Sequence, residues 1–179
     1  MCFEIQICNP SIGRRTSDQK ETLSSAILAV FPEVTEDAVM VWNWVPIRIN
    51  YNCDLSVMIE DLLLMLSDVL QSDHGSSATF FGSNTFRAAW SLSWADGTLR
   101  IETKWESVAG SYEDLLNSRS TLEVQRGQFL SEWKALLGKV IEAIDTSGIR
   151  IADQEHVLLL RRIEAAIPRC GKLYDGTDL

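Results

Sequence analysis

Two alternating segments on either side of Asp96-Gly97 constrain the fold of this chain more than any other feature. The residues expected on the inner face recur at every second position: Phe86, Ala88, Trp90, Leu92 and Trp94, then Leu99, Ile101, Thr103 and Trp105. Asp-Gly suits a two-residue type I′ turn, because both central residues of that turn need a positive φ. The sequence therefore predicts a β-hairpin that pairs Trp94 with Leu99, Leu92 with Ile101 and Ala88 with Trp105.

Apolar residues at helical spacing mark the segments before and after this hairpin. Residues 54–70 carry the clearest pattern, with Asp54 as the expected N-cap and an apolar residue at every third or fourth position. Three further helices are expected from spacing and stop signals: residues 18–31 before Pro32, about 122–144 before Gly148, and a last helix from Asp153 to just before Pro168.

The remaining segments complete an α+β pattern. Extended segments are expected at residues 3–8 and 39–52, an edge strand at 149–151, a short helical turn capped by Ser111, and a flexible polar linker at 71–77. This order predicts an antiparallel sheet that includes a Trp-rich hairpin, with amphipathic helices packed against it. The 179 residues fit a single domain, and the tail from about residue 170 is expected to be loose.

Negative charge is concentrated in one part of the chain. Residues 21–86 hold nine acidic residues and one basic residue, Arg48, which gives this segment −8 of the chain's net charge of −9. Such a local excess attracts a cationic partner and repels nucleic acid and anionic membranes. We therefore expect neither nucleic acid nor a membrane as partner, and the longest apolar stretch is too interrupted by acids to span a bilayer.

No motif of catalysis or cofactor binding occurs. Phosphate-binding loops and nucleophile elbows are absent, the two histidines stand far apart, and the four cysteines form no CxxC pair. We therefore expect a protein without catalytic activity, metal or cofactor. The N-terminus lacks the basic and apolar regions of a signal peptide, and the few cysteines are expected to be free thiols, so we expect a cytoplasmic protein.

The candidate partner-binding residues begin with an acidic row on the helix expected at 54–70. Asp54, Asp61 and Asp68 are seven residues apart and lie beside the apolar stripe of that helix, with Glu60 nearby. Val57 and Leu64 fall on the side opposite that stripe, so the surface has the composition of an interface centre with a charged rim. A solvated helix flank would give the same pattern, and both interpretations stay open.

Tryptophans and further acids complete the candidate set. Trp90, Trp94 and Trp105 fall on the apolar face of the hairpin and are expected in the core. Trp42 and Trp44 share a side with Arg48, so we expect them to be partly exposed, and tryptophan is strongly enriched in binding hot spots. The remaining candidates are the acids just before them: Glu33, Glu36 and Asp37.

The segment Trp44–Asn52 leading into Asp54-Leu55-Ser56, together with the Trp-rich hairpin, resembles small bacterial immunity proteins of contact-dependent growth inhibition systems. The resemblance covers roughly residues 40–106 and assigns no binding residue. It implies a cytoplasmic antitoxin that binds one cognate toxin domain, often a cationic nuclease, and occludes its active site without chemistry of its own. The acidic segment fits this role, because an anionic surface mimics nuclease-bound phosphates and speeds association.

Two other classes of function stay open. A non-catalytic regulatory or adaptor domain would bind a different protein partner. An enzyme or small-molecule-binding protein would hold a pocket that no motif reveals, and its ligand would raise the melting temperature by binding the folded state alone. The sequence also leaves the oligomeric state open.

Overall fold

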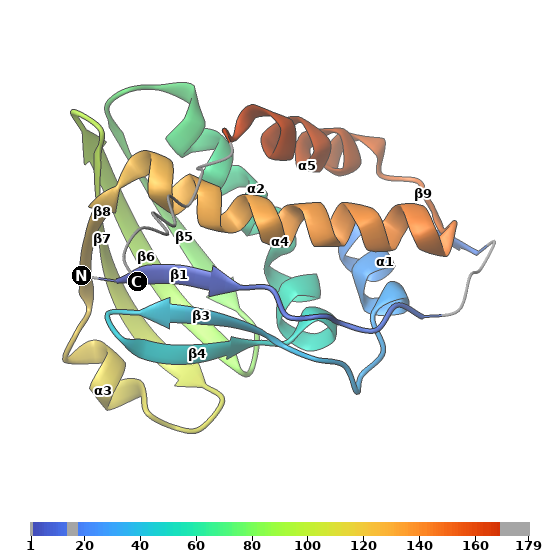
Figure 1. Cartoon of the computed structure of the whole chain (residues 1–179), viewed down its shortest axis with the longest axis horizontal. Helices are drawn as coiled ribbons and strands as arrows, with labels where there is room; N and C mark the ends of the chain where they lie inside the picture. The colour runs from blue at the N-terminus through green and yellow to red at the C-terminus, as the bar shows by residue number, and fades with distance from the viewer. Residues whose placement is uncertain (1, 14–17, 169–179) are drawn as a thin grey trace, which may run out of the picture.

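The computed structural model describes residues 2–13 and 18–168 and confirms the predicted α+β class (Figure 1). A four-stranded antiparallel sheet has the order β5-β6-β7-β8 and a three-stranded antiparallel sheet has the order β1-β3-β4. The strands of the first are Gly75–Gly82, Phe86–Ala95, Thr98–Val108 and Thr121–Gln125, and those of the second are Phe3–Gln6, Ala38–Trp42 and Val45–Ile49. A short parallel pair joins β2 (Gln19–Lys20) to β9 (Arg150–Ile151). The tail from residue 170 lies outside the described residues.

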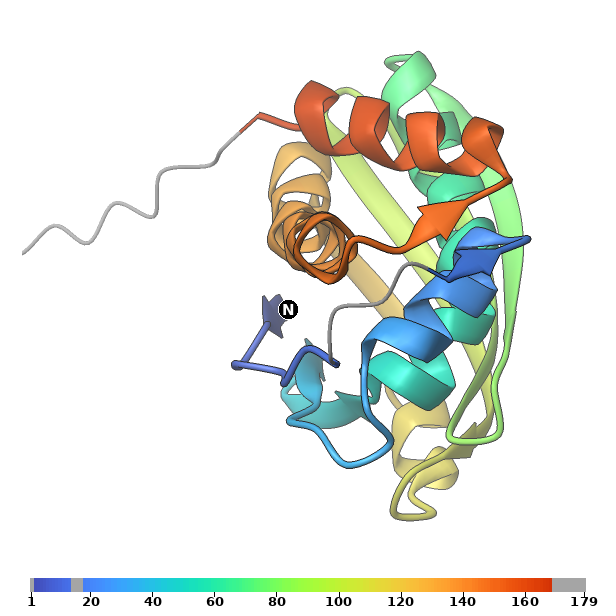
Figure 2. The ribbon, with the colours of Figure 1, turned by 90° about the vertical axis from the view of Figure 1, so that its right-hand side faces the viewer.

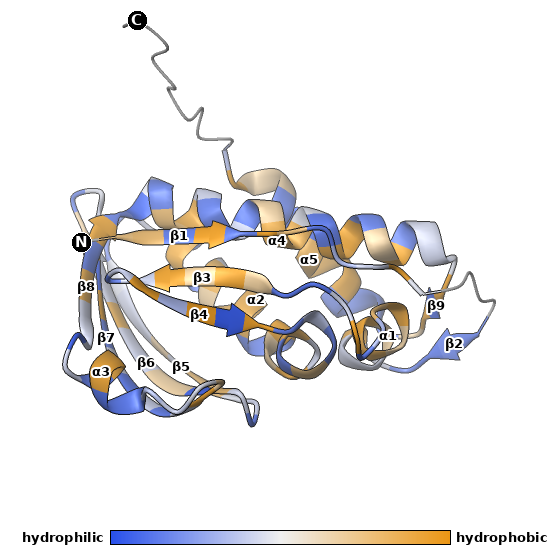
Figure 3. Ribbon diagram, turned by 60° about the horizontal axis from the view of Figure 1, so that its bottom comes forward, coloured by the Kyte–Doolittle hydropathy of each residue, from blue (hydrophilic) through white to orange (hydrophobic). Residues whose placement is uncertain are grey.

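The helices are α1 (Leu23–Val30), α2 (Ser56–Gln71), α3 (Glu113–Asn117), α4 (Arg126–Ser147) and α5 (Gln154–Ala166), with a π-helical turn at Tyr51–Leu55 before α2. Figure 2 shows α1, α2, α4 and α5 on one side of the four-stranded sheet. In Figure 3, β3 is coloured hydrophobic along most of its length and α4 alternates between hydrophilic and hydrophobic. No helix in the described ranges is long and apolar enough to cross a bilayer.

The predicted hairpin is confirmed as β6 and β7. Trp94 pairs with Leu99, Leu92 with Ile101 and Ala88 with Trp105, as the alternation required. Asp96 and Gly97 have φ values of 50° and 77°, so both central residues of the turn lie in the left-handed region.

Aromatic rings join the two sheets in the core. The Trp42 ring of β3 lies 5.2 Å from the Trp90 ring and 5.8 Å from the Trp105 ring, centroid to centroid. Trp42 is 0% exposed, and its indole N–H donates to the Arg119 carbonyl at 2.9 Å. The expectation that Trp42 is partly exposed is therefore wrong, whereas the core positions of the hairpin tryptophans are confirmed.

The error at Trp42 follows from an unrecognised turn. The segment expected to be extended over 39–52 is a second hairpin, in which β3 and β4 are joined at Asn43-Trp44. Both residues have positive φ, 46° and 71°, which is a type I′ geometry without glycine. The chain reverses there, so the alternation of faces does not continue from Trp42 to Arg48.

Several local expectations also change. The helix expected from about residue 122 begins at Arg126, because Thr121–Gln125 form β8, and the helix expected from residue 18 begins at Leu23, after β2. The linker expected at 71–77 is shorter, because β5 already begins at Gly75. Ser111 has a φ of 55° and does not cap α3, which follows Tyr112. The helix expected from Asp54 starts as the π-helical turn, whose N-cap is Asn50, and α2 proper begins at Ser56.

Candidate functional site

One side of α2 is exposed and carries alternating apolar and acidic residues. Val57, Asp61, Leu64 and Asp68 are spaced by three or four positions, so they lie along a single face of the helix. Val57 is 51% and Leu64 54% exposed, whereas the opposite face of α2 is buried in the core. A single exposed apolar side chain is ordinary, but several that gather in one place mark a surface suited to a partner.

A groove separates this face from β5. It has a volume of about 360 Å³ and is lined by Asp61, Leu64, Met65 and Asp68 of α2 and by Ser77, Ala78, Thr79 and Phe80 of β5. The Ser77 hydroxyl group donates to the Asp68 carboxylate at 2.6 Å and thereby joins the two walls. Phe80, at the other end of the lining, is 48% exposed.

The first turns of α5 border the other side of the same face. A hollow of about 390 Å³ lies there between α2 and α5, and Leu64, Ser67, Glu155, Leu158, Leu159 and Arg162 line it. Leu158 is 63% exposed. Leu64 lines both hollows and is therefore central. We define the α2 surface by six residues: Val57, Asp61, Leu64, Asp68, Phe80 and Leu158.

The two carboxylates of the α2 surface have no basic partner among the described residues. Neither Asp61 nor Asp68 forms an ion pair with a lysine, arginine or histidine of that part of the chain. Partial burial raises the pKa of Asp61 above its ordinary value. A cation brought to this surface would compensate charges that the fold leaves uncompensated.

Asp54 is not part of this surface. The sequence placed it in one exposed row with Asp61 and Asp68, but Asp54 is 1% exposed. Its carboxylate accepts hydrogen bonds from the Asn50 amide at 2.9 Å, from the Thr85 hydroxyl group at 2.6 Å, and from the Ser83 hydroxyl group. The π-helical turn rotates it inward, so its role as an N-cap and as a partner contact is excluded.

The three acids before β3 differ in whether their carboxylates are bonded within the fold. Asp37 forms an ion pair with Arg48 and accepts a hydrogen bond from Asn50 Nδ2 at 2.7 Å. Glu36 accepts a hydrogen bond from the Asn9 amide at 2.8 Å. Glu33 is exposed. None of the three lines the hollows beside the α2 surface.

Trp44 is exposed, as expected, but lies apart from the α2 surface. It is 73% exposed at the turn between β3 and β4, which Figure 1 places near α3 and away from α5. The preceding Asn43 side chain donates to the Arg119 carbonyl at 3.0 Å and to the Thr121 carbonyl at 2.7 Å. These bonds hold the turn, and with it Trp44, in a fixed position.

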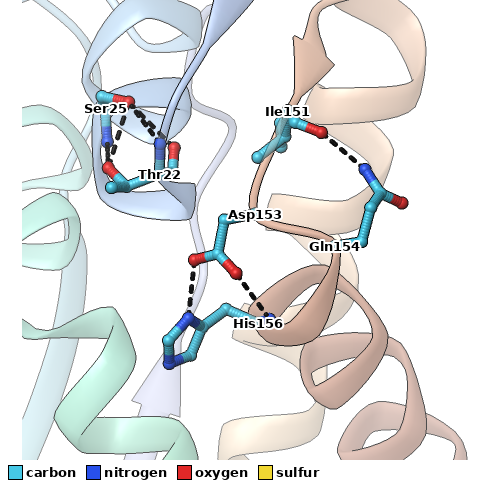
Figure 4. Close-up of polar contacts among 6 residues, drawn as sticks. All are labelled: Thr22, Ser25, Ile151, Asp153, Gln154 and His156. Carbon is cyan, nitrogen blue, oxygen red and sulfur yellow. Dashed lines mark hydrogen bonds and ion pairs between the residues drawn. The ribbon is translucent and has the colours of Figure 1, made fainter.

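Glu60 takes part in a polar cluster with α5 that the sequence did not indicate. Glu60, Asp153 and His156 each offer one oxygen or nitrogen atom within 4.8 Å of the others. Figure 4 shows the Asp153 carboxylate capping α5 through the His156 amide at 3.2 Å and binding His156 Nδ1 at 2.6 Å. This hydrogen bond raises the pKa of His156, and the charge of Glu60 adds to the effect. Asp153 and His156 are bonded to each other at the start of α5, and the Glu60 carboxylate of α2 lies beside them.

A further hollow of about 500 Å³ lies at the C-terminal end of α4. Gln19, Arg150, Gln154 and Arg161 are among its lining residues, and the Arg161 guanidinium is held by Asp145 at 3.2 Å. This hollow is larger than the two hollows beside the α2 surface.

Comparison with known proteins gives no match: no family model, curated protein or solved structure is similar to this chain. The assignment of function therefore depends on the geometry and charge of the chain itself.

Proposed function

We propose that this chain is a cytoplasmic immunity protein that binds a cationic toxin domain through the α2 surface and occludes its active site without catalysis. One observation carries the proposal. Leu64 is exposed between Asp61 and Asp68, two carboxylates without a basic partner in the described part of the chain. An apolar centre with a charged rim is the ordinary anatomy of a protein-binding surface.

In the expected mechanism, charge speeds association and apolar contact slows dissociation. The negative field of residues 21–86 steers the toxin domain toward the surface and raises the association rate. Asp61 and Asp68 then pair with lysines or arginines beside the toxin's active site. Leu64, Phe80 and Leu158 supply the apolar contact area, which limits dissociation.

The test begins with the domain encoded at the C-terminal end of the reading frame immediately upstream. We expect that domain to arrest growth when expressed alone and to bind this chain tightly when both are present. Affinity measured at low and high salt should fall as salt rises, since salt screens the pairing of exposed charges.

A pair of charge variants locates the interface. Asp61→Asn with Asp68→Asn should slow association at least tenfold and flatten its salt dependence. The matched control is Glu106→Gln with Asp114→Asn, which removes two exposed acids from β7 and α3 and changes the net charge equally. Equal association rates for the two double variants would exclude the α2 surface as the docking site.

The alternatives give different results. A regulatory or adaptor domain would leave growth arrest by the upstream domain unrelieved and would bind another protein. A small-molecule-binding protein would show a ligand-dependent rise in melting temperature that substitutions in the 500 Å³ hollow abolish.

A further inference from the structure

β5 is an edge strand whose outer side is open. It pairs with β6 over all eight residues from Gly75 to Gly82. Among the described residues, no other strand pairs with it and no loop or turn forms a backbone hydrogen bond to it. An open edge presents a row of unpaired N–H and C=O groups, which is a template for a further strand.

The hairpin register identifies the residues that present these groups. Ala95 and Thr98 flank the two-residue turn and form a hydrogen-bonded pair, so alternate residues of β6 bond to β7. The residues between them, including Trp94 and Trp90, bond to their β5 partners, including Gly75 and Thr79. The backbone groups that point to the open edge are therefore those of four residues: Ser76, Ala78, Phe80 and Gly82.

The other edges of the two antiparallel sheets each carry a protecting feature. On β1, the Ile5 amide donates to the Glu132 carboxylate of α4 at 2.9 Å. On β8, the Thr121 carbonyl accepts a hydrogen bond from Asn43. β4 contains Pro46, whose carbonyl accepts a hydrogen bond from Tyr112 at 2.7 Å. Proline and charged side chains are common means of protecting an edge from pairing.

β5 is less protected, because its sequence, Gly-Ser-Ser-Ala-Thr-Phe-Phe-Gly, contains no charge and no proline. The Arg87 guanidinium donates to the Gly82 carbonyl at 3.5 Å, so the open part of the edge runs from Ser76 to Phe80. The groove beside it follows the strand edge. Its lining includes the consecutive residues Ser77, Ala78, Thr79 and Phe80, whose side chains alternate between the two faces of the sheet. Only a groove along the edge borders both faces of a strand. Its other wall carries Asp61 and Asp68.

We propose that the open edge of β5 receives an extended basic segment of the partner, which adds to the four-stranded sheet as a fifth strand. This inference rests on the proposed function and specifies the form of the toxin segment. Lysine or arginine side chains on the α2 side of the added strand would reach Asp61 and Asp68. The two acids are seven residues apart, about 10 Å along a helix, which an extended chain covers in about three residues.

The charge beside the β5 edge favours a basic segment over the β5 strand of a second copy of the chain. Pairing β5 with β5 of another copy would bring two sets of Asp61 and Asp68 together without a basic residue to compensate them. Like charges placed opposite each other are destabilising, whereas a basic segment neutralises both carboxylates.

A proline substitution tests the backbone contact. Ala78→Pro removes one outward N–H while leaving the bonds between β5 and β6, and an edge strand tolerates proline with its nitrogen facing outward. We expect binding to the upstream-encoded toxin domain to weaken at least thirtyfold. The matched variant Ala78→Thr keeps the N–H and should bind within threefold of the unmodified chain. Both variants should show an unchanged circular dichroism spectrum.

Hydrogen exchange of the unmodified chain provides a second measurement that does not depend on folding of the proline variant. In the free chain, the amides of Ala78 and Phe80 should exchange quickly and those of Ser77 and Thr79 slowly. Addition of the toxin domain should protect Ala78 and Phe80.

The outcomes separate this inference from the proposed function. Tight binding of the toxin domain without protection of Ala78 and Phe80 would overturn strand addition and leave the immunity function standing. Absence of any binding would overturn both. A concentration-dependent dimer of the free chain that Ala78→Pro abolishes would assign the edge to a second copy and overturn the basic segment as occupant.

Discussion

The Thr85 hydroxyl group donates a hydrogen bond of 2.6 Å to the Asp54 carboxylate, although 31 positions separate the two residues. Ser83 donates to the same carboxylate oxygen, and the Asn50 amide donates to the other at 2.9 Å. Asp54 therefore joins the π-helical turn before α2 to the turn between β5 and β6. The position of β5 relative to α2 depends on this buried carboxylate.

Replacing Asp54 should destabilise the fold strongly. Asp54→Ala removes the acceptor of the buried Ser83 hydroxyl group and of two part-buried donors, from Asn50 and Thr85. An unsatisfied buried donor costs about 1–3 kcal/mol, so we expect a loss of about 3 kcal/mol in the free energy of unfolding. Urea denaturation measures the change. Asp61→Ala removes an exposed carboxylate nearby and should change the free energy by less than about 0.5 kcal/mol. A loss below about 1 kcal/mol for Asp54→Ala would mean that these donors find other acceptors.

Trp44→Gly should stabilise the protein. Trp44 has a φ of 71°, a conformation that costs a non-glycine residue about 1–2 kcal/mol, and its 73% exposure means that little burial is lost. We expect a gain of about 0.5–1 kcal/mol after the added chain entropy of glycine is counted. Asn43→Gly relieves the same kind of strain but removes two hydrogen bonds, so it should destabilise. Equal effects of the two variants in urea denaturation would contradict this explanation.

Substitution by alanine should change the stability of the protein differently at the two glycines of β5. A Cβ atom at Gly75 would lie 2.6 Å from the Trp94 ring, which is buried, whereas the nearest atom to a Cβ at Gly82 is 3.6 Å away. Gly75→Ala should therefore cost about 1–3 kcal/mol through overpacking, and Gly82→Ala should be neutral or slightly stabilising. Thermal unfolding of both variants checks the contrast. Equal stability would mean that the Trp94 ring moves aside freely.

His156 should make stability depend on pH. Its hydrogen bond to Asp153, with the charges of Glu60 and Glu155, raises its pKa in the folded state, so the protonated form is favoured there. This contribution is complete below the unfolded pKa of about 6.5 and is lost as pH rises through the folded pKa. The stability difference between the unmodified chain and His156→Gln should therefore shrink between pH 5.5 and pH 8.5. The change should not exceed about 1 kcal/mol, because the pair is partly exposed.

Asp153→Asn provides the control for this pH dependence, because asparagine is still a good N-cap but carries no charge. The pH dependence due to His156 should flatten in that background. Urea denaturation across the pH range measures both variants, and a difference that grows as pH rises would contradict the assignment.

Local pattern was sufficient for much of the fold. The register from Ala88 to Trp105 followed from alternation and one Asp-Gly dipeptide, because both signals lie within twenty residues of chain. Apolar spacing likewise predicted α2 and most of α4, but it missed β8, because Leu122 and Val124 also fit the helical spacing that continues into α4. The turn at Asn43-Trp44 was missed because tryptophan rarely adopts a positive φ, and the bonds that hold Asn43 come from residues far along the chain, Cys2, Arg119 and Thr121.

Part of the candidate site could likewise be predicted from local periodicity. The periodicity of α2 placed Val57, Leu64, Asp61 and Asp68 away from the core, and the structure confirms their exposure. Asp54 has the same spacing but is buried, because its partners Ser83 and Thr85 are far along the chain. Nor does any local pattern show that β5 and α5 border this face.

The unequal burial of the tryptophans provides an optical reporter. Trp42, Trp90, Trp94, Trp105 and Trp133 are at most 5% exposed, whereas Trp44 is 73% exposed. An aqueous quencher such as iodide or acrylamide therefore reaches the Trp44 indole far more readily than the other five. The quenchable fraction of the intrinsic fluorescence therefore reports on the β3–β4 turn without a label, and it should fall when a partner covers that turn.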